Sequence, residues 1–154
     1  MTIQRSIQAI PDPAAKAELI FDWPLRVYYE DSDAGGIVYH SQYLNFMERA
    51  RTEWLRYLGF EQTELIAEFN ILFVVRNIEI QFKRPARFND AVIVRSRLEK
   101  LGRSRMVFAQ DILRGDEHLI EATVEIACID ADKYAPVTIP SIIQNKMQAT
   151  MESQ

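Results

Sequence analysis

Hydrophobic and polar positions follow two different periods along this chain, and each period predicts its own kind of secondary structure. Between residues 41 and 58, apolar side chains recur every three or four positions, which is typical of one face of an α-helix. We therefore expect a helix of about five turns there, with Ser41 as the N-cap residue and Gly59 just beyond the C-terminal end. The apolar stripe consists of Tyr43, Phe46, Met47, Ala50, Trp54, Tyr57 and Leu58.

Outside this helix, the spacing of apolar residues favours β-strands with one polar face. Turn residues at 101–104 and 114–117 predict short hairpins between the last three strands. We expect the last four strands to be neighbours in chain order, with the helix packed against their common apolar face. The strand candidates are residues 21–30, 71–83, 91–99, 105–113 and 118–130.

This pattern predicts an α+β fold, in which a curved antiparallel five-stranded sheet surrounds one long central helix. A sheet of that size has exposed edge strands, so we expect two copies of the chain to pair edge to edge. The length of 154 residues fits one domain, which we place at residues 21–140. Residues 1–20 form an N-terminal extension in this interpretation, and residues 141–154 form a C-terminal tail.

Composition narrows the classes of function. The chain is 48% hydrophobic and 26% charged, as in ordinary globular proteins, and its net charge of −4 argues against a nucleic-acid-binding face. No stretch approaches the roughly 20 apolar residues of a membrane span, and no secretory signal is predicted. The single Cys128 excludes an intramolecular disulfide and fits a cytoplasmic location.

The strongest chemical candidate is the segment that joins the first strand to the long helix. Asp31 and Asp33 stand there next to Gly35 and Gly36, just before a helix N-terminus whose free N–H groups favour negative charge. Those N–H groups can hold the oxyanion that develops on an ester or thioester carbonyl. Asp33 can then act as a general base or as a nucleophile. An ordinary solvated turn has the same composition, so the residues alone leave both interpretations open.

Metal and cofactor sites are not expected. A calcium loop fails because Gly35 and Gln42 occupy positions that need oxygen ligands. The two histidines, His40 and His118, lie on different elements, which argues against a zinc site.

A second candidate is the basic hairpin of the predicted sheet. It contains Lys100, Arg103 and Arg105 together with the hydroxyl of Ser104. Such groups can bind the phosphate of a small molecule, although a solvated turn has the same appearance.

Three runs of the sequence resemble one known family. These are YYEDSDAGGIVYHSQYLNFMERARTEWLRYLGF, FVVRNIEIQFKRPARFND and KLGRSRMVF. They resemble the hotdog-fold acyl-CoA thioesterases of the hydroxybenzoyl-CoA thioesterase class, in particular the bacterial subgroup associated with the Tol-Pal cell-envelope system. The resemblance covers roughly residues 21–140.

The resemblance implies a hotdog fold that pairs into homodimers and then into tetramers, and an enzyme that hydrolyses acyl-CoA to a carboxylic acid and free CoA. It implies that Asp33 is the essential carboxylate and that the backbone N–H of His40 polarises the thioester carbonyl. It also implies that the hairpin binds the CoA phosphates. The hairpin residues concerned are Lys100, Arg103, Ser104 and Arg105.

CoA is then part of the substrate, and no separate cofactor is expected. Several alternatives stay open: base or nucleophile for Asp33, CoA or acyl carrier protein as the carrier, and the identity of the acyl group. The chain can also be a non-catalytic acyl-CoA-binding or partner-binding module on the same fold. A dehydratase ranks last, because His40 has no second acid–base partner beyond Asp33.

Overall fold

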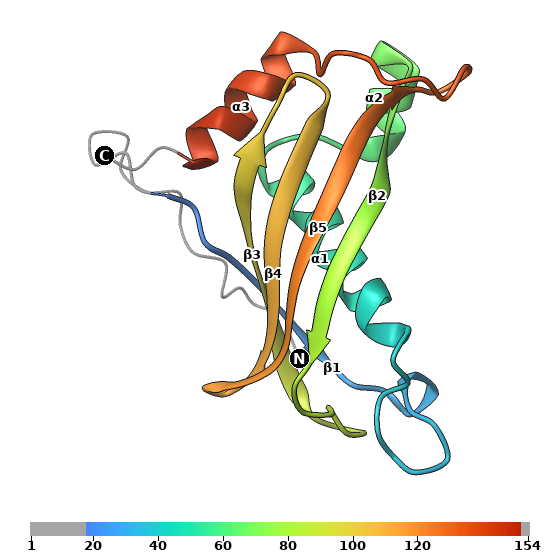
Figure 1. Ribbon diagram of the computed structural model, residues 1–154, viewed down its shortest axis with the longest axis vertical. Coiled ribbons are helices and arrows are strands. Elements are labelled where there is room, and N and C mark those ends of the chain that lie inside the picture. Colours follow the sequence, from blue (N-terminus) through green and yellow to red (C-terminus); the bar gives the residue numbers. More distant parts are fainter. Residues whose placement is uncertain (1–17, 152–154) are drawn as a thin grey trace.

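A five-stranded antiparallel sheet forms one layer of the molecule, and a long helix lies across one face of it (Figure 1). The computed structural model describes residues 18–151. The expected architecture, an antiparallel sheet around one long helix, is confirmed. The elements in chain order are β1 (Phe21–Arg26), the 3-10 helix η1 (Tyr29–Asp31), α1 (Gln42–Tyr57), α2 (Gln62–Phe69), β2 (Ile71–Phe82), β3 (Ala91–Leu101), β4 (Arg105–Arg114), β5 (Glu117–Asp130) and α3 (Ser141–Met151).

The order of strands in the sheet is β1-β3-β4-β5-β2. The two predicted hairpins are present, since β4 pairs with β3 on one side and with β5 on the other. The expectation that β2 lies beside β3 is wrong: β2 pairs with β5, where Ile78 faces Val124, and β3 pairs with β1. Residues 83–90 connect β2 to β3, and this long connection lets the chain pass from the β2 edge to the other half of the sheet, which a two-residue hairpin turn would not.

The core lies between α1 and the sheet. The predicted apolar stripe is buried there: Phe46, Met47, Ala50 and Trp54 are all 0% exposed. Trp54 meets Phe108 of β4 edge to face, with ring centroids 4.8 Å apart. Complete burial of each large apolar side chain stabilises the fold by roughly 1.5–3 kcal/mol, so this stripe fixes α1 on the sheet.

Both predicted helix ends are found. Ser41 directly precedes α1, although its side chain makes no capping hydrogen bond. Gly59 has φ +102°, a conformation that residues with a side chain rarely adopt. Its N–H donates to the carbonyl of Arg56 at 2.9 Å, which closes the last turn of the helix.

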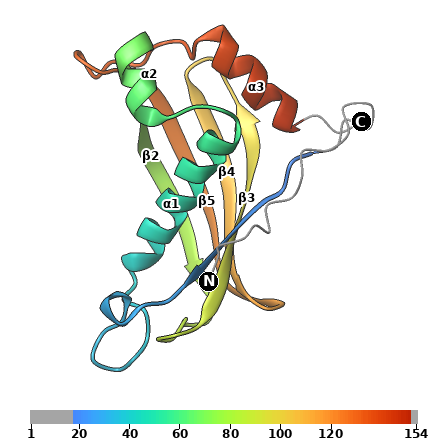
Figure 2. The ribbon, with the colours of Figure 1, turned by 180° about the vertical axis from the view of Figure 1, so that it is seen from behind.

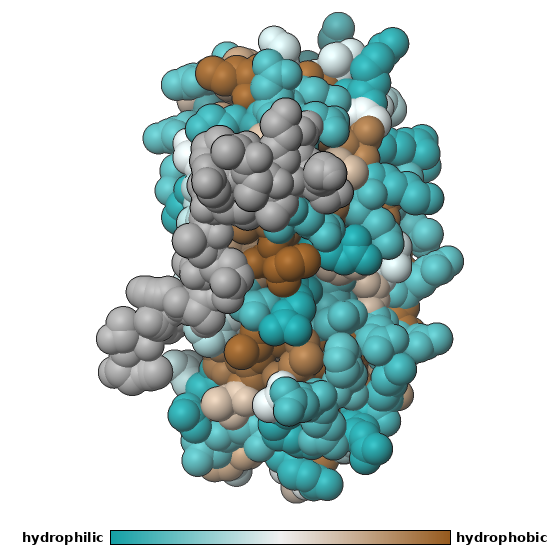
Figure 3. Space-filling view, turned by 90° about the vertical axis from the view of Figure 1, so that its left-hand side faces the viewer, coloured by the Kyte–Doolittle hydropathy of each residue, from teal (hydrophilic) through white to brown (hydrophobic). Residues whose placement is uncertain are grey.

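The chain after β5 returns along the sheet and adds to the core. The Val137 N–H donates to the Cys128 carbonyl at 3.0 Å, and in α3 the side chains of Ile143 and Met147 are 0% exposed. Seen from the side where α3 and β3 lie, the surface is mostly hydrophilic, with apolar side chains in its middle (Figure 3). Most of the predicted N-terminal extension, residues 1–17, lies outside the described residues. Within residues 18–151, no helix has the length and apolar character needed to cross a membrane.

Candidate active site

The loop that carries Asp33 lies at one end of the sheet, between η1 and α1 (Figure 2). The loop folds back on itself: the Asp33 N–H donates to the Ile37 carbonyl at 2.9 Å, and the Gly36 N–H donates to the Asp33 carbonyl at 3.0 Å. Gly36 has φ +83°, so the turn requires a glycine there. The Asp33 side chain is exposed, and its Oδ1 accepts a hydrogen bond from the Gly35 N–H at 2.8 Å. The carboxylate is therefore oriented by its own loop while it stays open to solvent.

A second loop, residues 84–90, supports the first one. The Val38 N–H donates to the Ala86 carbonyl at 2.9 Å, and the Phe88 N–H donates to the Gly36 carbonyl at 3.0 Å. The Ala86 N–H in turn donates to the Tyr43 hydroxyl of α1 at 2.9 Å. Burial raises the pKa of Tyr43, so this hydroxyl stays neutral at physiological pH. The site loop is thus tied through Ala86 to the first turn of the long helix.

The two aspartates of the loop occupy different environments. Asp31 is only 3% exposed, and both of its carboxylate oxygens accept hydrogen bonds of 2.8 Å. Oδ2 binds the Tyr28 N–H, and Oδ1 binds Nε2 of Gln42. Asp33 is therefore the member of the pair whose carboxylate solvent or a substrate can reach.

His40 lies at the end of the same loop, immediately before α1. Its side chain is exposed and its ring contacts that of Tyr39, with centroids 4.4 Å apart. The first amide of the helix, that of Gln42, is already bonded to the Tyr39 carbonyl at 2.9 Å. Within residues 18–151, the amide N–H groups of His40 and Ser41 have no acceptor. These two donors, located at the helix N-terminus, can hold a carbonyl oxygen that becomes negatively charged.

The basic hairpin lies at the opposite end of the sheet, between β3 and β4 and beside α3 (Figure 1). The eleven residues of β3 separate the two ends by about 30 Å, at roughly 3.3 Å per residue. Arg105 pairs with Glu125 at 3.1 Å, whereas Lys100 and Arg103 are exposed and have no ion pair within the described part of the chain. Ser104 is half-buried.

The structure thus forms two separate groups from the predicted site residues. Asp33 and His40 share one loop, and the four hairpin residues share one turn. A single chain does not bring the two groups together.

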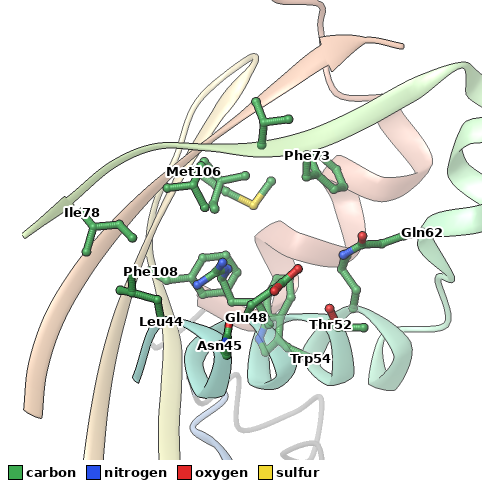
Figure 4. A pocket seen from close by; sticks show the side chains of 15 residues that line it. Leu44, Asn45, Glu48, Thr52, Trp54, Gln62, Phe73, Ile78, Met106 and Phe108 are labelled. Carbon is green, nitrogen blue, oxygen red and sulfur yellow. The ribbon is translucent and has the colours of Figure 1, made fainter. Parts of the chain in front are cut away.

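A cavity of about 490 Å³ lies between α1 and β2 (Figure 4). One wall is apolar and comes from the sheet, with Phe73 and Ile78 of β2 and Met106 and Phe108 of β4. The cavity begins at the first turn of α1, next to the end of the Asp33 loop, because Leu44 and Asn45 line it.

The other wall of the cavity comes from α1 and is mixed, because Leu44, Trp54 and Leu55 line it beside polar side chains. Asn45, Glu48 and Thr52 line it, and in Figure 4 Glu48 and Thr52 extend from the helix towards the strands. Arg51 also lines it, and its Nη1 donates to Oε1 of Gln110 at 2.9 Å. Burial lowers the pKa of Arg51 to about 10, an effect that the charge of Glu48 opposes.

This cavity could not be predicted from the sequence, because the polar positions of α1 look like an ordinary solvated helix face. The available signal was the position of Arg51, four residues after Met47 and three before Trp54, which places a charged residue beside the apolar stripe.

Other reactive side chains are poorly placed for catalysis. Cys128 is fully buried, and burial raises the pKa of its thiol to about 11, so it is a core residue. Within residues 18–151, no group of three or more His, Cys, Asp or Glu side chains could hold a metal ion.

Comparisons with known proteins identify the family of this chain. The model of the Thioesterase superfamily matches residues 35–121. The acyl-CoA thioesterase YbgC of Haemophilus influenzae is 42% identical over 124 residues, which cover 80% of this chain and 91% of that protein. The acyl-CoA thioester hydrolase YbgC of Escherichia coli is 42% identical over 125 residues, covering 80% and 92%. The crystal structure of a "Probable Thioesterase" from Bartonella henselae has a TM-score of 0.75 and 40% identity, covering 79% of this chain and 99% of that one.

Proposed function

This chain belongs to the Thioesterase superfamily and is a thioester hydrolase, and we propose that it hydrolyses acyl-CoA thioesters at the loop that carries Asp33. The observation that carries this proposal is the pairing of an exposed, oriented carboxylate with unbonded amides at a helix N-terminus. The two YbgC relatives, which are named for acyl-CoA hydrolysis, support the choice of carrier.

In the proposed reaction, the carbonyl oxygen of the thioester lies against the N–H groups of His40 and Ser41. As a base, Asp33 takes a proton from water while the water oxygen attacks the carbonyl carbon. The negative charge that develops on the carbonyl oxygen is held by the two amides. The tetrahedral intermediate then collapses, the C–S bond breaks, and the CoA sulfur leaves and takes up the proton.

Asp33 can also attack the carbonyl carbon itself and form a mixed anhydride that water then cleaves. A single turnover in H₂¹⁸O separates the two routes. Label in the Asp33 carboxylate indicates an anhydride that water cleaves at the Asp33 carbonyl carbon, whereas the base route leaves this carboxylate unlabelled.

The acyl group is proposed to occupy the cavity between α1 and β2. The cavity starts at Leu44 and Asn45, one turn away from the amides of His40 and Ser41. Its apolar wall suits a hydrocarbon or aromatic acyl group.

A second copy of the chain is proposed to complete the site. The hairpin with Lys100 and Arg103 is about 30 Å from the Asp33 loop along β3, so a hairpin that binds the CoA phosphates has to come from a neighbouring subunit. β2 is an edge strand whose outer side has no partner strand within residues 18–151, and it can pair with the same strand of a second copy. We propose such a homodimer, and a tetramer built from it. Acyl carrier protein as the carrier, a cytoplasmic location and the Tol-Pal association stay predictions.

The first test of the function is thiol release from short, long and aromatic acyl-CoAs. We expect the wild type to turn over at least one of them. Asp33→Asn keeps the shape of the side chain but removes its charge, and we expect it to lose a factor of about 10²–10⁴ in kcat. Asp116→Asn, the same change at the exposed β4–β5 hairpin, is the matched control and should retain activity.

Near-normal hydrolysis by Asp33→Asn would show that this carboxylate does no chemistry. If both proteins bind acyl-CoA and neither releases thiol, the chain is a non-catalytic acyl-CoA-binding module.

The hairpin is tested with substrates that differ only in their phosphates. Arg103→Ala should raise KM about tenfold for an acyl-CoA, since one charge-assisted contact is worth about 1.5 kcal/mol. With the matching N-acetylcysteamine thioester, which has no phosphate, KM should not change. Lys133→Ala, an exposed cation after β5, is the control. Equal changes with both substrates would remove Arg103 from the phosphate site.

A further inference from the structure

We propose that Asp31 is a positioning residue of the active site, whose buried carboxylate connects the Asp33 loop, through Gln42, to Asn45 at the wall of the acyl cavity. This inference rests on the proposed function in that it takes Asp33 as the catalytic carboxylate. Asp31 itself has no contact with the reacting atoms in this proposal.

Asp31 holds the site loop at several points. Its Oδ2 accepts the Tyr28 N–H at 2.8 Å, and its carbonyl oxygen accepts the Tyr39 N–H at 3.1 Å. One residue thus binds the segments on both sides of Asp33. Its Oδ1 accepts Nε2 of Gln42, the first residue of α1, at 2.8 Å. The start of the loop, its end and the helix N-terminus therefore share one anchor.

The same network reaches the cavity. Oε1 of Gln42 accepts a hydrogen bond from Nδ2 of Asn45 at 2.6 Å, and Asn45 lines the cavity. The orientation of the Gln42 amide is determined by its two partners, because a carboxylate only accepts hydrogen bonds and the Asn45 amide nitrogen only donates them. An acyl group in contact with Asn45 therefore affects Gln42, which binds the Asp31 carboxylate. Through Asp31 it affects the loop that carries Asp33.

A direct chemical role for Asp31 disagrees with its surroundings. Its side chain is 3% exposed, and both carboxylate oxygens are already bonded. A general base needs a free oxygen within reach of the proton that it takes. Asp33, two residues further on, is exposed and meets that condition.

The central variant is Asp31→Asn. In the native orientation of the Gln42 and Asn45 amides, its amide nitrogen would face either the Tyr28 N–H or Nε2 of Gln42, a donor against a donor; only a 180° turn of both amides would relieve this contact. Because a displacement of about 1 Å in a site can cost 10²-fold in rate, we expect kcat to fall by about 10–100-fold, while KM changes by less than about threefold. Gln42→Glu alone should also lose activity, since it places a second carboxylate against Asp31.

The decisive variant combines the two changes. In Asp31→Asn/Gln42→Glu, the amide at position 31 can accept the Tyr28 N–H and donate to the carboxylate at position 42. That carboxylate can still accept the Asn45 amide. All three hydrogen bonds are then possible again, with the negative charge at position 42 instead of position 31. We therefore expect kcat to return to within about threefold of the wild type.

A double variant no more active than Asp31→Asn would overturn the proposal. Activity would then depend on the negative charge at position 31 and not on the hydrogen bonds that this residue makes. Near-normal kcat in both single variants would overturn it as well. Asp116→Asn and Gln148→Glu make the same chemical changes at exposed positions and control for the altered charge.

Amide hydrogen exchange provides a readout that does not depend on catalysis. Tyr28 donates its N–H to the Asp31 carboxylate, whereas Tyr39 donates to the Asp31 backbone carbonyl, which the substitution leaves in place. Asp31→Asn should therefore speed exchange at Tyr28, and the double variant should slow it again. If the wild type hydrolyses no thioester, the proposed function fails while the exchange data still decide the positioning role. Unchanged exchange in Asp31→Asn would reject that role even if the enzyme is active. Thermal unfolding shows in each case that the variant is folded.

Discussion

Tyr43 is where the long helix holds the loop that supports the site, and Tyr43→Phe isolates that single contact. The side chain is 3% exposed, and its hydroxyl accepts the N–H of Ala86, which is 0% exposed, at 2.9 Å. Phenylalanine keeps the ring and its edge contact with Phe46, whose centroid is 6.2 Å away. The variant therefore removes one oxygen and leaves the Ala86 N–H buried without an acceptor.

The expected loss of stability follows from the buried Ala86 N–H that is left without an acceptor. An unsatisfied polar group inside a protein costs about 1–3 kcal/mol, and we expect the free energy of unfolding to fall by this amount. For a domain of this size, each kcal/mol corresponds to about 2–4 °C in Tm, so the expected decrease is about 2–12 °C. The Ala86 carbonyl also accepts the Val38 N–H of the site loop. We therefore expect kcat to fall together with stability.

The assay is urea unfolding of the wild type and the variant, with thermal unfolding as a second measurement. Tyr134→Phe is the matched control, because the Tyr134 side chain is 70% exposed and has no hydrogen-bond partner within residues 18–151. The control should stay within about 0.5 kcal/mol of the wild type. An equally small effect of Tyr43→Phe would refute the reasoning, because it would mean that the Ala86 N–H is satisfied in another way.

Two further predictions concern stability. Met147 of α3 is 0% exposed, so Met147→Ala should lower the free energy of unfolding by about 2–5 kcal/mol, against little change for the exposed neighbour Asn145→Ala; a loss below 1 kcal/mol would show that α3 contributes little to the core. Burial, followed by the charge of Glu121, raises the pKa of Asp111 above its ordinary value of 3.8. The folded state then binds this proton more tightly than the unfolded state, so stability falls as pH rises through the raised pKa. Asp111→Asn should therefore raise Tm at pH 7, with a gain that shrinks as pH approaches 4; a gain independent of pH would contradict this assignment.

Some of the site could be predicted from the sequence because it depends on residues that are close in the chain. Asp33 is placed by a turn that its own neighbours form, and His40 directly precedes a helix whose period is visible in the sequence. The different environments of Asp31 and Asp33, one buried and one exposed, could not be predicted from the pattern of residues, because the two side chains are chemically identical. Asp31 is buried by contacts with Tyr28 and with Gln42, eleven positions away.

The fold also has features that could be predicted from the sequence and features that could not. Helix and strand periods are local properties, and the sequence by itself determined α1, the two hairpins and the five-stranded class of the sheet. Only the tertiary structure decided that β2 pairs with β5 instead of β3, because residues 83–90 are long enough to allow either edge. That choice places β2 opposite the polar side of α1 and turns an apparently solvated helix face into the wall of a cavity. Its physical reason is long-range packing, which joins residues about fifty positions apart and leaves no periodic signal in the sequence.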